Sequence, residues 1–419
     1  MGGRGVGGRV SSRELERDGD AGALSFDSGA QFFTASSPEF QREVAGWAAA
    51  GAASEWAGRH GHISPGGGFE PAQTDSSSSS SGFFGAGSRQ PLWVGTPTNQ
   101  AICRHLAQEL LGTAAQQQEQ EGRQGGARQP LFELLSGVAV QSMERVGSGC
   151  GGGGGWALRG SRQGRAAAAL PPPEQQEELG SYDAVILADA TPLLPGSAGH
   201  VAGIDAAASS LAQLARSVQA VAPQPCFALM VAFCRPLPGV PFDSAFVGHP
   251  DEAVGGSSSA GGGDSGSSAS GGSAFQWVAC NSSKPGRPGS KGGAPQCWVA
   301  LTTARRAQRL LLAHPLTGPG GRLNPQTAEY RAAVAAELLA DFRVLMQPFV
   351  QGALPAPVHV SAQRWGRAFV AEPLGAELLF LPAQRLALCG DVAAGSGVEA
   401  AWRSGRAAGA AVGRLLRAA

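Results

Sequence analysis

The segment at residues 385–409 constrains the fold of this chain more than any other part of its sequence. A mostly apolar run ends at Gly390-Asp391, and a glycine-containing turn then leads into a stretch rich in small residues. This order predicts a buried β-strand, a tight turn and a helix whose first turn carries no bulky side chain. Free N–H groups at such a helix start, with the positive end of the dipole behind them, stabilise negative charge on a ligand. An ordinary strand, turn and terminal helix of an α/β protein is the alternative.

Composition limits the class of protein. The 419 residues suffice for one large or two ordinary domains, and 42% of them are hydrophobic. The 32 basic and 32 acidic residues balance, and no basic stripe alternates with aromatic residues, so nucleic acid is not an expected partner. No apolar run reaches the length of a membrane span. The seven cysteines include no C-x-x-C pair, which predicts reduced, buried thiols and no metal site.

Glycine and serine concentrate in tracts of low complexity. These tracts cannot bury enough apolar surface to offset chain entropy, so they predict disordered insertions within a folded scaffold. The expected loops are residues 74–90, 147–155, 162–180 and 255–273.

The remaining blocks predict secondary structure by their periodicity. Helices are expected at residues 40–56, 99–111 and 327–346, and strands at 131–145, 156–159, 182–188, 227–233, 275–280 and 297–302. Strands of a parallel sheet thus lie towards each end of the chain, with an antiparallel block between them. This order predicts α/β combined with α+β architecture.

Three separated segments carry glycines and charged residues in a distinctive order. They are Gly7-Gly8-Arg9 with FDSGAQFFT at residues 26–34, then NSSKPGRP at 281–288, and finally Arg364-Trp365 with Gly390-Asp391. In this order they resemble the renalase-like branch of the FAD-dependent amine oxidoreductases, which shares a two-domain fold with the amine oxidases. The similarity extends from the first residues to about Gly409 and leaves out the low-complexity tracts.

The resemblance implies a Rossmann-like FAD-binding domain with an inserted antiparallel-sheet substrate domain. It assigns residues 1–40, 91–196 and 360–419 to the FAD-binding domain, and 41–90 and 197–359 to the substrate domain. The cofactor-binding residues it implies are Gly7, Gly8, Arg9, Gly29, Ala30, Gln31, Val140, Trp365, Gly390, Asp391, Gly397 and Val398.

The charged and glycine-rich candidates have physical interpretations of their own. Gly7 and Gly8 let the backbone approach a pyrophosphate closely, and Arg9 offers it a planar guanidinium. A flexible glycine-rich tail is the alternative. Asp391 can accept hydrogen bonds from sugar or ribityl hydroxyls.

The other candidates are equally open to structural interpretations. Residues 29–31 place small side chains and one amide beside the flavin, or they form a plain turn into a strand. The resemblance implies that the main-chain groups of Val140 contact the adenine, and the alternative is a core valine. Trp365 walls the flavin pocket, or it belongs to the core.

Lys284 and Arg287 lie in a loop rich in proline and glycine, where solvated charges are the ordinary expectation. The alternatives are that they brace the junction between the two domains or attract an anionic substrate. We favour a structural role for both.

The chain departs from the family pattern at its start. Proteins of this family open with a strand, a Gly-x-Gly-x-x-Gly turn, a helix and a second strand that ends in a ribose-binding acid. We expect either that about 35 to 40 residues, the length of one βαβ unit, precede Met1 in the complete protein, or that this relative no longer binds FAD. We favour the first, because Gly7-Gly8-Arg9 and Gly390-Asp391 have little reason to coexist without the cofactor.

The resemblance implies hydride transfer to FAD from a C–H bond next to nitrogen, and we expect O2 to be the acceptor. The substrate is an amine or a reduced nicotinamide derivative. Such chemistry resides in the cofactor, and no Ser/His/Asp set, Cys/His dyad or carboxylate pair stands out, so no catalytic residue is named.

The second hypothesis is a non-catalytic flavoprotein relic, or a truncated product, that acts as a binding scaffold. The sequence fits the cytoplasm, a chloroplast or a mitochondrion equally.

Overall fold

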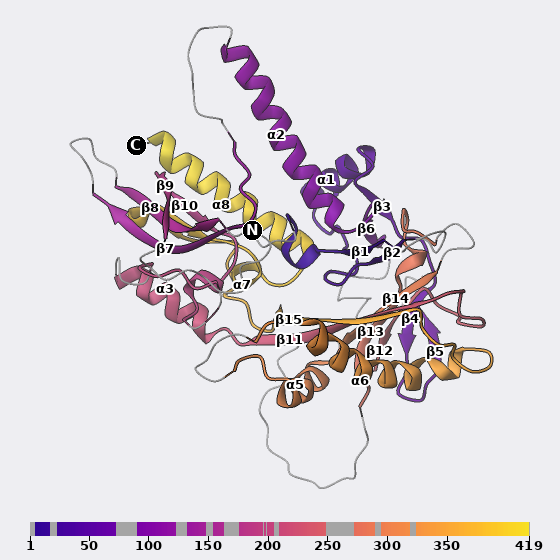
Figure 1. Cartoon of the computed structure of the whole chain (residues 1–419). Helices are drawn as coiled ribbons and strands as arrows, with labels where there is room; N and C mark the ends of the chain where they lie inside the picture. The colour runs from indigo at the N-terminus through magenta and orange to yellow at the C-terminus, as the bar shows by residue number, and fades with distance from the viewer. Residues whose placement is uncertain are drawn as a thin grey trace.

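The computed structural model describes most of the chain outside the low-complexity tracts. The described residues are 5–16, 23–72, 90–122, 132–147, 154–162, 176–195, 197, 199–204, 209–248, 272–289, 295–318 and 324–418. They form a mixed α/β structure with several sheets (Figure 1). No helix among them is both long and apolar enough to cross a membrane. Most of the four ranges expected to be loops lies outside the described residues.

A seven-stranded sheet forms the centre of the described chain. Its strands, in spatial order, are β15 (His359–Val370), β11 (Pro223–Phe233), β14 (Gln296–Thr302), β13 (Phe275–Cys280), β12 (Ser244–Val247), β4 (His60–Ile63) and β5 (Phe69–Pro71). All neighbours pair antiparallel except β12 and β4. The antiparallel block expected from residues 227–233, 275–280 and 297–302 is therefore confirmed.

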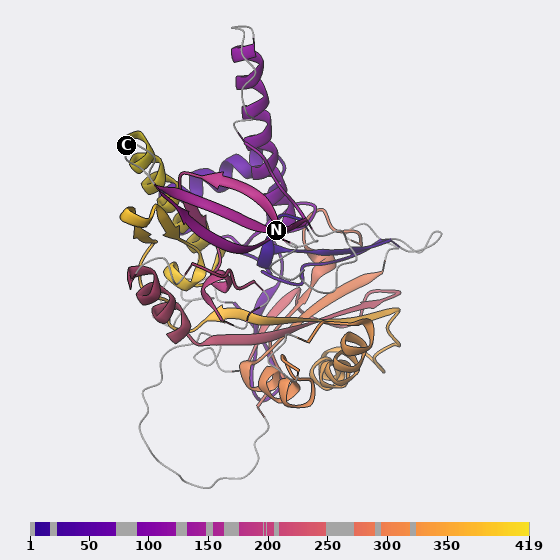
Figure 2. The ribbon, with the colours of Figure 1, turned by 60° about the vertical axis from the view of Figure 1, so that its left-hand side comes forward.

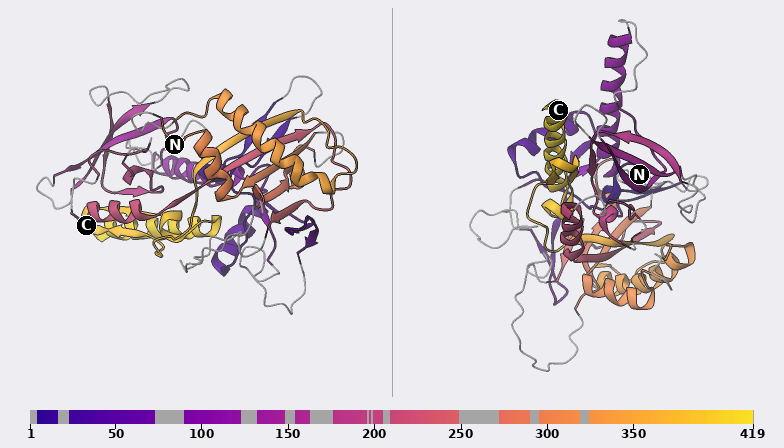
Figure 3. Two further views of the ribbon diagram at one scale, coloured as in Figure 1. Left: turned by 90° about the horizontal axis from the view of Figure 1, so that it is seen from below. Right: turned by 90° about the vertical axis from the view of Figure 1, so that its left-hand side faces the viewer.

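Helices α5 (Ala304–Ala313) and α6 (Ala328–Met346) cover one face of this sheet (Figure 3, left). Phe227, Leu229 and Val231 of β11 pack against Leu338 and Phe342 of α6 in one buried cluster. The Thr327 hydroxyl accepts a hydrogen bond from the N–H of Tyr330 at the start of α6. The predicted helix at 327–346 is thus confirmed.

The alternate residues of β11 face the other side of the sheet, as the two-residue period of a strand requires. Met230 and Ala232 pack there with Phe26, Trp56 and Val94. These partners come from the N-terminal part of the chain, which contains β1 (Arg13–Leu15), β2 (Leu24–Phe26), β3 (Ala53–Glu55) and β6 (Trp93–Gly95). The N-terminal segments thus lie on the face opposite α5 and α6.

Helix α1 (Pro38–Ala49) is shorter than the range 40–56 predicted for it. Ser37 caps the start of α1. Just after the end of the helix, Gly51 has a φ of 74°, a left-handed conformation that favours glycine and terminates helices. Helix α2 (Gln100–Gly122) runs beyond the predicted range 99–111 and projects from the rest of the chain (Figure 2).

Two further sheets have three strands each. One contains β7 (Val138–Val146), β8 (Gly155–Arg162) and β9 (Glu177–Tyr182), and the other contains β10 (Val185–Leu187), β17 (Leu386–Leu388) and β16 (Leu379–Leu381). Strands β10 and β17 are parallel. Other helices of the described chain are α3 (Ser209–Ala220), α7 (Asp391–Ala394) and α8 (Val398–Ala418). The short 3-10 turns of the described chain are η1 (Gly8–Val10), η5 (Thr191–Leu193), η6 (Asn281–Ser283), η8 (Gln347–Phe349) and η9 (Pro382–Gln384).

Several boundaries here differ from those expected. The predicted strand at 182–188 is the end of β9 followed by β10, and Ile186 is 40% exposed, so β10 is not wholly buried. Strand β9 occupies the end of the range 162–180 that we expected to be a loop. Strand β7 begins at Val138 and not at residue 131.

The cysteines are less uniform than expected. Cys234 is exposed at the end of β11, so the prediction of buried thiols is wrong there. Burial raises the pKa of the Cys226 and Cys280 thiols to about 12, which leaves both protonated and unreactive. Cys150 lies outside the described residues.

Candidate functional site

The glycine-rich N-terminal segment forms a tight turn that ends in η1. Gly7 has a φ of 123° and Gly8 a φ of 50°, values that favour glycine. The N–H of Val10 bonds to the carbonyl of Gly7 at 2.8 Å. Gln100, at the start of α2, donates from its side-chain amide to the carbonyl of Val6 at 2.6 Å. The turn is therefore held to the start of α2.

Residues 29–31 lie directly against this turn. The N–H of Ala30 bonds to the carbonyl of Arg9 at 2.8 Å. A Cβ on Gly29 would lie 1.8 Å from that same carbonyl oxygen, so only glycine fits there. The small size of Gly29 is thus required by the backbone of Arg9. Gln31 donates to the carbonyl of Gly29 at 2.9 Å, and its buried side-chain oxygen has no hydrogen-bond partner within the described part of the chain.

The C-terminal candidates meet the N-terminal turn. Strand β17 ends at Leu388. Gly390 follows with a φ of 104°, which favours glycine, and its N–H bonds to the Ser404 hydroxyl at 2.8 Å. Asp391 follows at the start of α7, and its carboxylate forms an ion pair with the Arg9 guanidinium. Arg9 also donates to the carbonyl of Arg367 at 3.1 Å. Two residues separated by 382 positions in the sequence are therefore in direct contact.

The charges around Arg9 are balanced and partly accessible. The side chain of Arg9 is 40% exposed and that of Asp391 is 12% exposed. Burial lowers the pKa of Arg9, but its hydrogen bond to Asp391 and the charges of Asp391 and Asp189 outweigh burial and raise it. Arg9 therefore stays protonated. Burial lowers the pKa of neighbouring Arg367, and repulsion from Arg9 adds to this effect.

Trp365 links the edge of the large sheet to the same region. It lies on β15, and its ring N–H donates to the carbonyl of Ser28 at 2.7 Å. Its ring is partly buried against the cluster that contains Phe26 and Met230. Trp365 therefore contacts the residue that immediately precedes Gly29.

Three further cofactor candidates are not members of the Arg9–Asp391 ion pair. Val140 of β7 packs in an apolar cluster with Trp156 and Leu388. Gly397, with a φ of 138°, precedes α8, and Val398 packs beside Trp402 against the cluster around α1.

Glu399 in the first turn of α8 connects that helix to α1. Its carboxylate accepts hydrogen bonds from the N–H groups of Ser36 and Ser37, both at 2.8 Å, and from the Ser37 hydroxyl. Burial opposes the charged form, but these bonds outweigh it and lower the pKa of Glu399. Glu399 therefore joins the starts of two helices.

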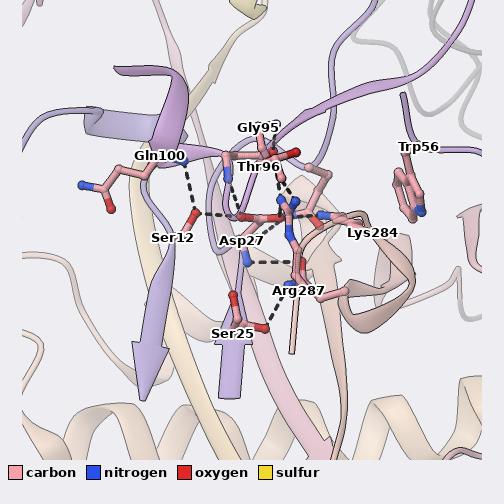
Figure 4. Close-up of polar contacts among 12 residues, drawn as sticks. Ser12, Ser25, Asp27, Trp56, Gly95, Thr96, Gln100, Lys284 and Arg287 are labelled. Carbon is pink, nitrogen blue, oxygen red and sulfur yellow. Dashed lines mark hydrogen bonds and ion pairs between the residues drawn. The ribbon is translucent and has the colours of Figure 1, made fainter. Parts of the chain in front are cut away.

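A second polar cluster surrounds Asp27, which precedes residues 29–31 in the chain (Figure 4). Asp27, at the end of β2, is fully buried, and its carboxylate accepts from the Ser12 hydroxyl at 2.7 Å and from the N–H of Asn99 at 3.0 Å. Because Asn99 immediately precedes α2, the carboxylate also lies near the positive end of that helix. Gln31 donates to the backbone carbonyl of Asp27 at 2.5 Å.

Two cations from the loop after η6 share one oxygen of Asp27. The Lys284 ammonium lies 3.0 Å from Asp27 Oδ2, and the Arg287 guanidinium lies 2.6 Å from it. Lys284 is 0% exposed and Arg287 is 2% exposed, so neither is a solvated loop charge. Arg287 also donates to the carbonyl of Gly95 at 2.6 Å. The two residues brace the large sheet against the N-terminal segments, which agrees with the structural role favoured above.

The ionisation of this cluster follows from its burial. Burial disfavours the charged form of Asp27, but Lys284 and Arg287 outweigh it and hold the pKa of that carboxyl well below its usual range. Burial lowers the pKa of Lys284 to about 8, because the attraction of Asp27 does not offset burial together with repulsion from Arg287.

Sequence reasoning missed several residues of these clusters. Asp27 belongs to the FDSGAQFFT segment, but that segment alone predicts no role for its carboxylate, and no local pattern distinguishes Ser12 or Asn99. Asp189 was also missed, although it follows β10 as Asp391 follows β17. An acid just after each of two neighbouring strands was the available signal for Asp189.

No model of a known protein family matches the chain. Among the described residues, no group of three or more His, Cys, Asp or Glu side chains could hold a metal ion. A cavity of about 280 Å³ lies near the ends of β13 and β14, and none of the cofactor candidates lines it.

Proposed function

We propose that the protein is an FAD-dependent oxidoreductase similar to the renalase-like amine oxidoreductases. One observation carries this proposal: Arg9 pairs with Asp391 while its carbonyl accepts the N–H of Ala30. Candidate residues from the first and last parts of the resemblance thus meet in one place. A Rossmann-like arrangement of the cofactor domain is part of the proposal, and the parallel pair β10 and β17 supports it.

The residues present fit a phosphate-bearing cofactor. A Cβ on Gly8 or Gly397 would meet nothing within 4 Å, so a ligand could approach the backbone closely at both positions. The partly exposed Arg9 guanidinium would bind the pyrophosphate, and Asp391 would accept hydroxyl groups of the ribityl chain or ribose. The buried, unpartnered oxygen of Gln31 would accept one further hydrogen bond.

Bound FAD would supply hydride acceptance from a C–H bond next to nitrogen, with O2 as the final acceptor that yields hydrogen peroxide. The protein's part is to orient the substrate and exclude water. Trp365 and Phe32, both partly buried on the same side of the large sheet, would form an apolar wall for a planar or aliphatic substrate. An amine and a reduced nicotinamide derivative both suit such a wall.

The test is the visible absorption spectrum of the purified protein after incubation with FAD and gel filtration. The chain, and the same chain preceded by what its gene encodes upstream, should be compared. We expect retained flavin bands that bleach on addition of an amine or a dihydronicotinamide substrate without O2. Absence of flavin bands from both versions would contradict the proposal.

A non-catalytic scaffold is the second candidate function. Arg9 and Asp391 neutralise each other directly, so the fold at this point does not require a bound cofactor. Under this alternative both versions fold, with a cooperative unfolding transition, and neither retains flavin.

A further inference from the structure

The cluster around Asp27 contains more positive than negative charge. Its charged members are one carboxylate, Asp27, and two cations, Lys284 and Arg287, all essentially buried. Their formal sum is one positive charge. A surplus charge in a buried site costs folding stability, because neither water nor a counter-charge solvates it.

The two cations are not equivalent. Arg287 bonds to Asp27, to Asn99 at 3.2 Å and to the carbonyls of Gly95 and Pro285 at 2.6 and 2.8 Å. Among the described residues, Lys284 has one oxygen partner, Asp27, and it also lies over the ring of Trp56, 5.2 Å from its centroid. Without Lys284, Asp27 would still be paired with Arg287 and bonded to Ser12 and Asn99.

The chain otherwise uses lysine sparingly. Of its 32 basic residues only Lys284 and Lys291 are lysines, and Lys291 lies outside the described residues. A compact ammonium at position 284 makes fewer fixed hydrogen bonds than a guanidinium and keeps its charge concentrated.

Hydrogen bonds connect the cluster that carries the surplus charge to the proposed phosphate-binding segments. Gln31 bonds to the backbone of Asp27, and the Ser12 hydroxyl that binds Asp27 also accepts from the N–H of Gln100 at 3.4 Å. Gln100 in turn holds the carbonyl of Val6 at the start of the glycine turn. A low-dielectric interior separates the charge from these segments and screens it little.

We propose that Lys284 supplies, at a cost to folding stability, the positive charge that favours a phosphate-bearing ligand at the Gly7–Arg9 turn and residues 29–31. The placement of the ligand rests on the proposed function. Lys284 does not touch the ligand; it acts as a positioning charge through the buried cluster.

The test compares Lys284→Met with Arg287→Met and with Lys291→Arg as the matched control. Thermal unfolding and the Kd values for FAD, neutral riboflavin and inorganic pyrophosphate are measured for each. Lys284→Met is expected to raise Tm by about 2 to 4 °C and to weaken FAD and pyrophosphate about tenfold, the scale of one uncompensated charge at this depth. Riboflavin should be unaffected by this change.

Arg287→Met should lower Tm, because it leaves the partners of Arg287 without a donor. Three results for Lys284→Met would overturn the inference. They are a lower Tm, an unchanged Kd for both anionic ligands, and an equal loss of affinity for riboflavin and FAD. If the protein binds pyrophosphate but no flavin, the proposed function fails, while a weaker pyrophosphate Kd in Lys284→Met still supports the role of Lys284. Binding of neither ligand overturns both.

Discussion

At the residue scale, Asp27 is the most consequential side chain of the described structure. It has four hydrogen-bonding partners and is the only carboxylate within ion-pair distance of Lys284 or Arg287 among the described residues. Its charge therefore compensates two buried cations at once.

Replacing Asp27 by Asn should destabilise the protein strongly. The change leaves two buried cations without a counter-charge, for which the expected loss in unfolding free energy is about 3 to 5 kcal/mol. Urea denaturation measures this loss. A loss below about 1 kcal/mol would show that the cluster is not buried as described.

The pKa of Lys284 predicts an uncommon pH dependence. Its folded pKa is about 8 against 10.5 for an ordinary lysine, so the unfolded chain binds more protons between these values. The contribution of Lys284 to the free energy of unfolding therefore rises as pH increases from about 8 to 10.5. The thiols of Cys226 and Cys280 act in the opposite direction, since their pKa values are raised to about 12.

The measurement is therefore the difference in unfolding free energy between the unaltered protein and Lys284→Met, under reducing conditions, at several pH values. This difference removes the contribution of the thiols. We expect the unaltered protein to gain stability relative to Lys284→Met as pH rises from about 8 to 10.5. A flat difference would contradict the lowered pKa.

Gly29 offers a second test at the residue scale. Gly29→Ala would place a methyl group 1.8 Å from the Arg9 carbonyl oxygen, so either the turn or residues 29–31 must move. We expect a loss of about 2 kcal/mol or more in stability. Gly46→Ala is the control, because Gly46 lies within α1 with nothing within 4 Å of its Cβ position, and it should stabilise the protein. Equal effects of the two changes would contradict the close contact.

At the element scale, the starts of α1 and α8 are tied together by one side chain. Glu399→Ala removes the acceptor of three hydrogen bonds from Ser36 and Ser37. We expect a loss of about 1 to 3 kcal/mol, because the N–H groups at the start of α1 lose a charged acceptor. Glu39→Ala is the control, since Glu39 makes only an exposed ion pair with Arg42 at 3.9 Å. A Glu399→Ala protein as stable as this control would contradict the contact.

The edge strand β15 shows how a side chain can complete a sheet. Gln326 accepts from the N–H of Arg364 at 2.7 Å and donates to the carbonyl of Arg364 at 3.0 Å. This single amide reproduces the pairing of a neighbouring strand at one residue of the edge.

Sequence patterns predicted the elements whose signal is local. The continuous apolar runs of β11, β13 and β14, and the periodicity of α6 after Thr327, each depend on neighbours in the chain. The overextended prediction for α1 failed at Gly51, where one left-handed glycine outweighs the apolar residues that follow. Local patterns carry no information on partners, so the exposure of Ile186 could not be foreseen.

At the scale of the whole molecule, the candidate site depends on contacts between remote segments. Asp27 and Lys284 are separated by 257 positions, and neither neighbourhood shows that the other exists. The contact of Arg9 with Asp391 could be expected only because the resemblance placed both beside one cofactor. For Lys284 and Arg287 solvated charges were the ordinary expectation and bracing was an alternative, because a polar loop gives no sign of complete burial.

The central claim is that the two ends of the described chain form one FAD site. The most direct measurement is the Kd for FAD, from quenching of flavin fluorescence, for the unaltered protein and for Arg9→Met and Asp391→Ala. The account predicts saturable binding that each change weakens by at least about tenfold, the loss of one charge-assisted contact. Absence of binding, or binding that neither change weakens, would contradict it.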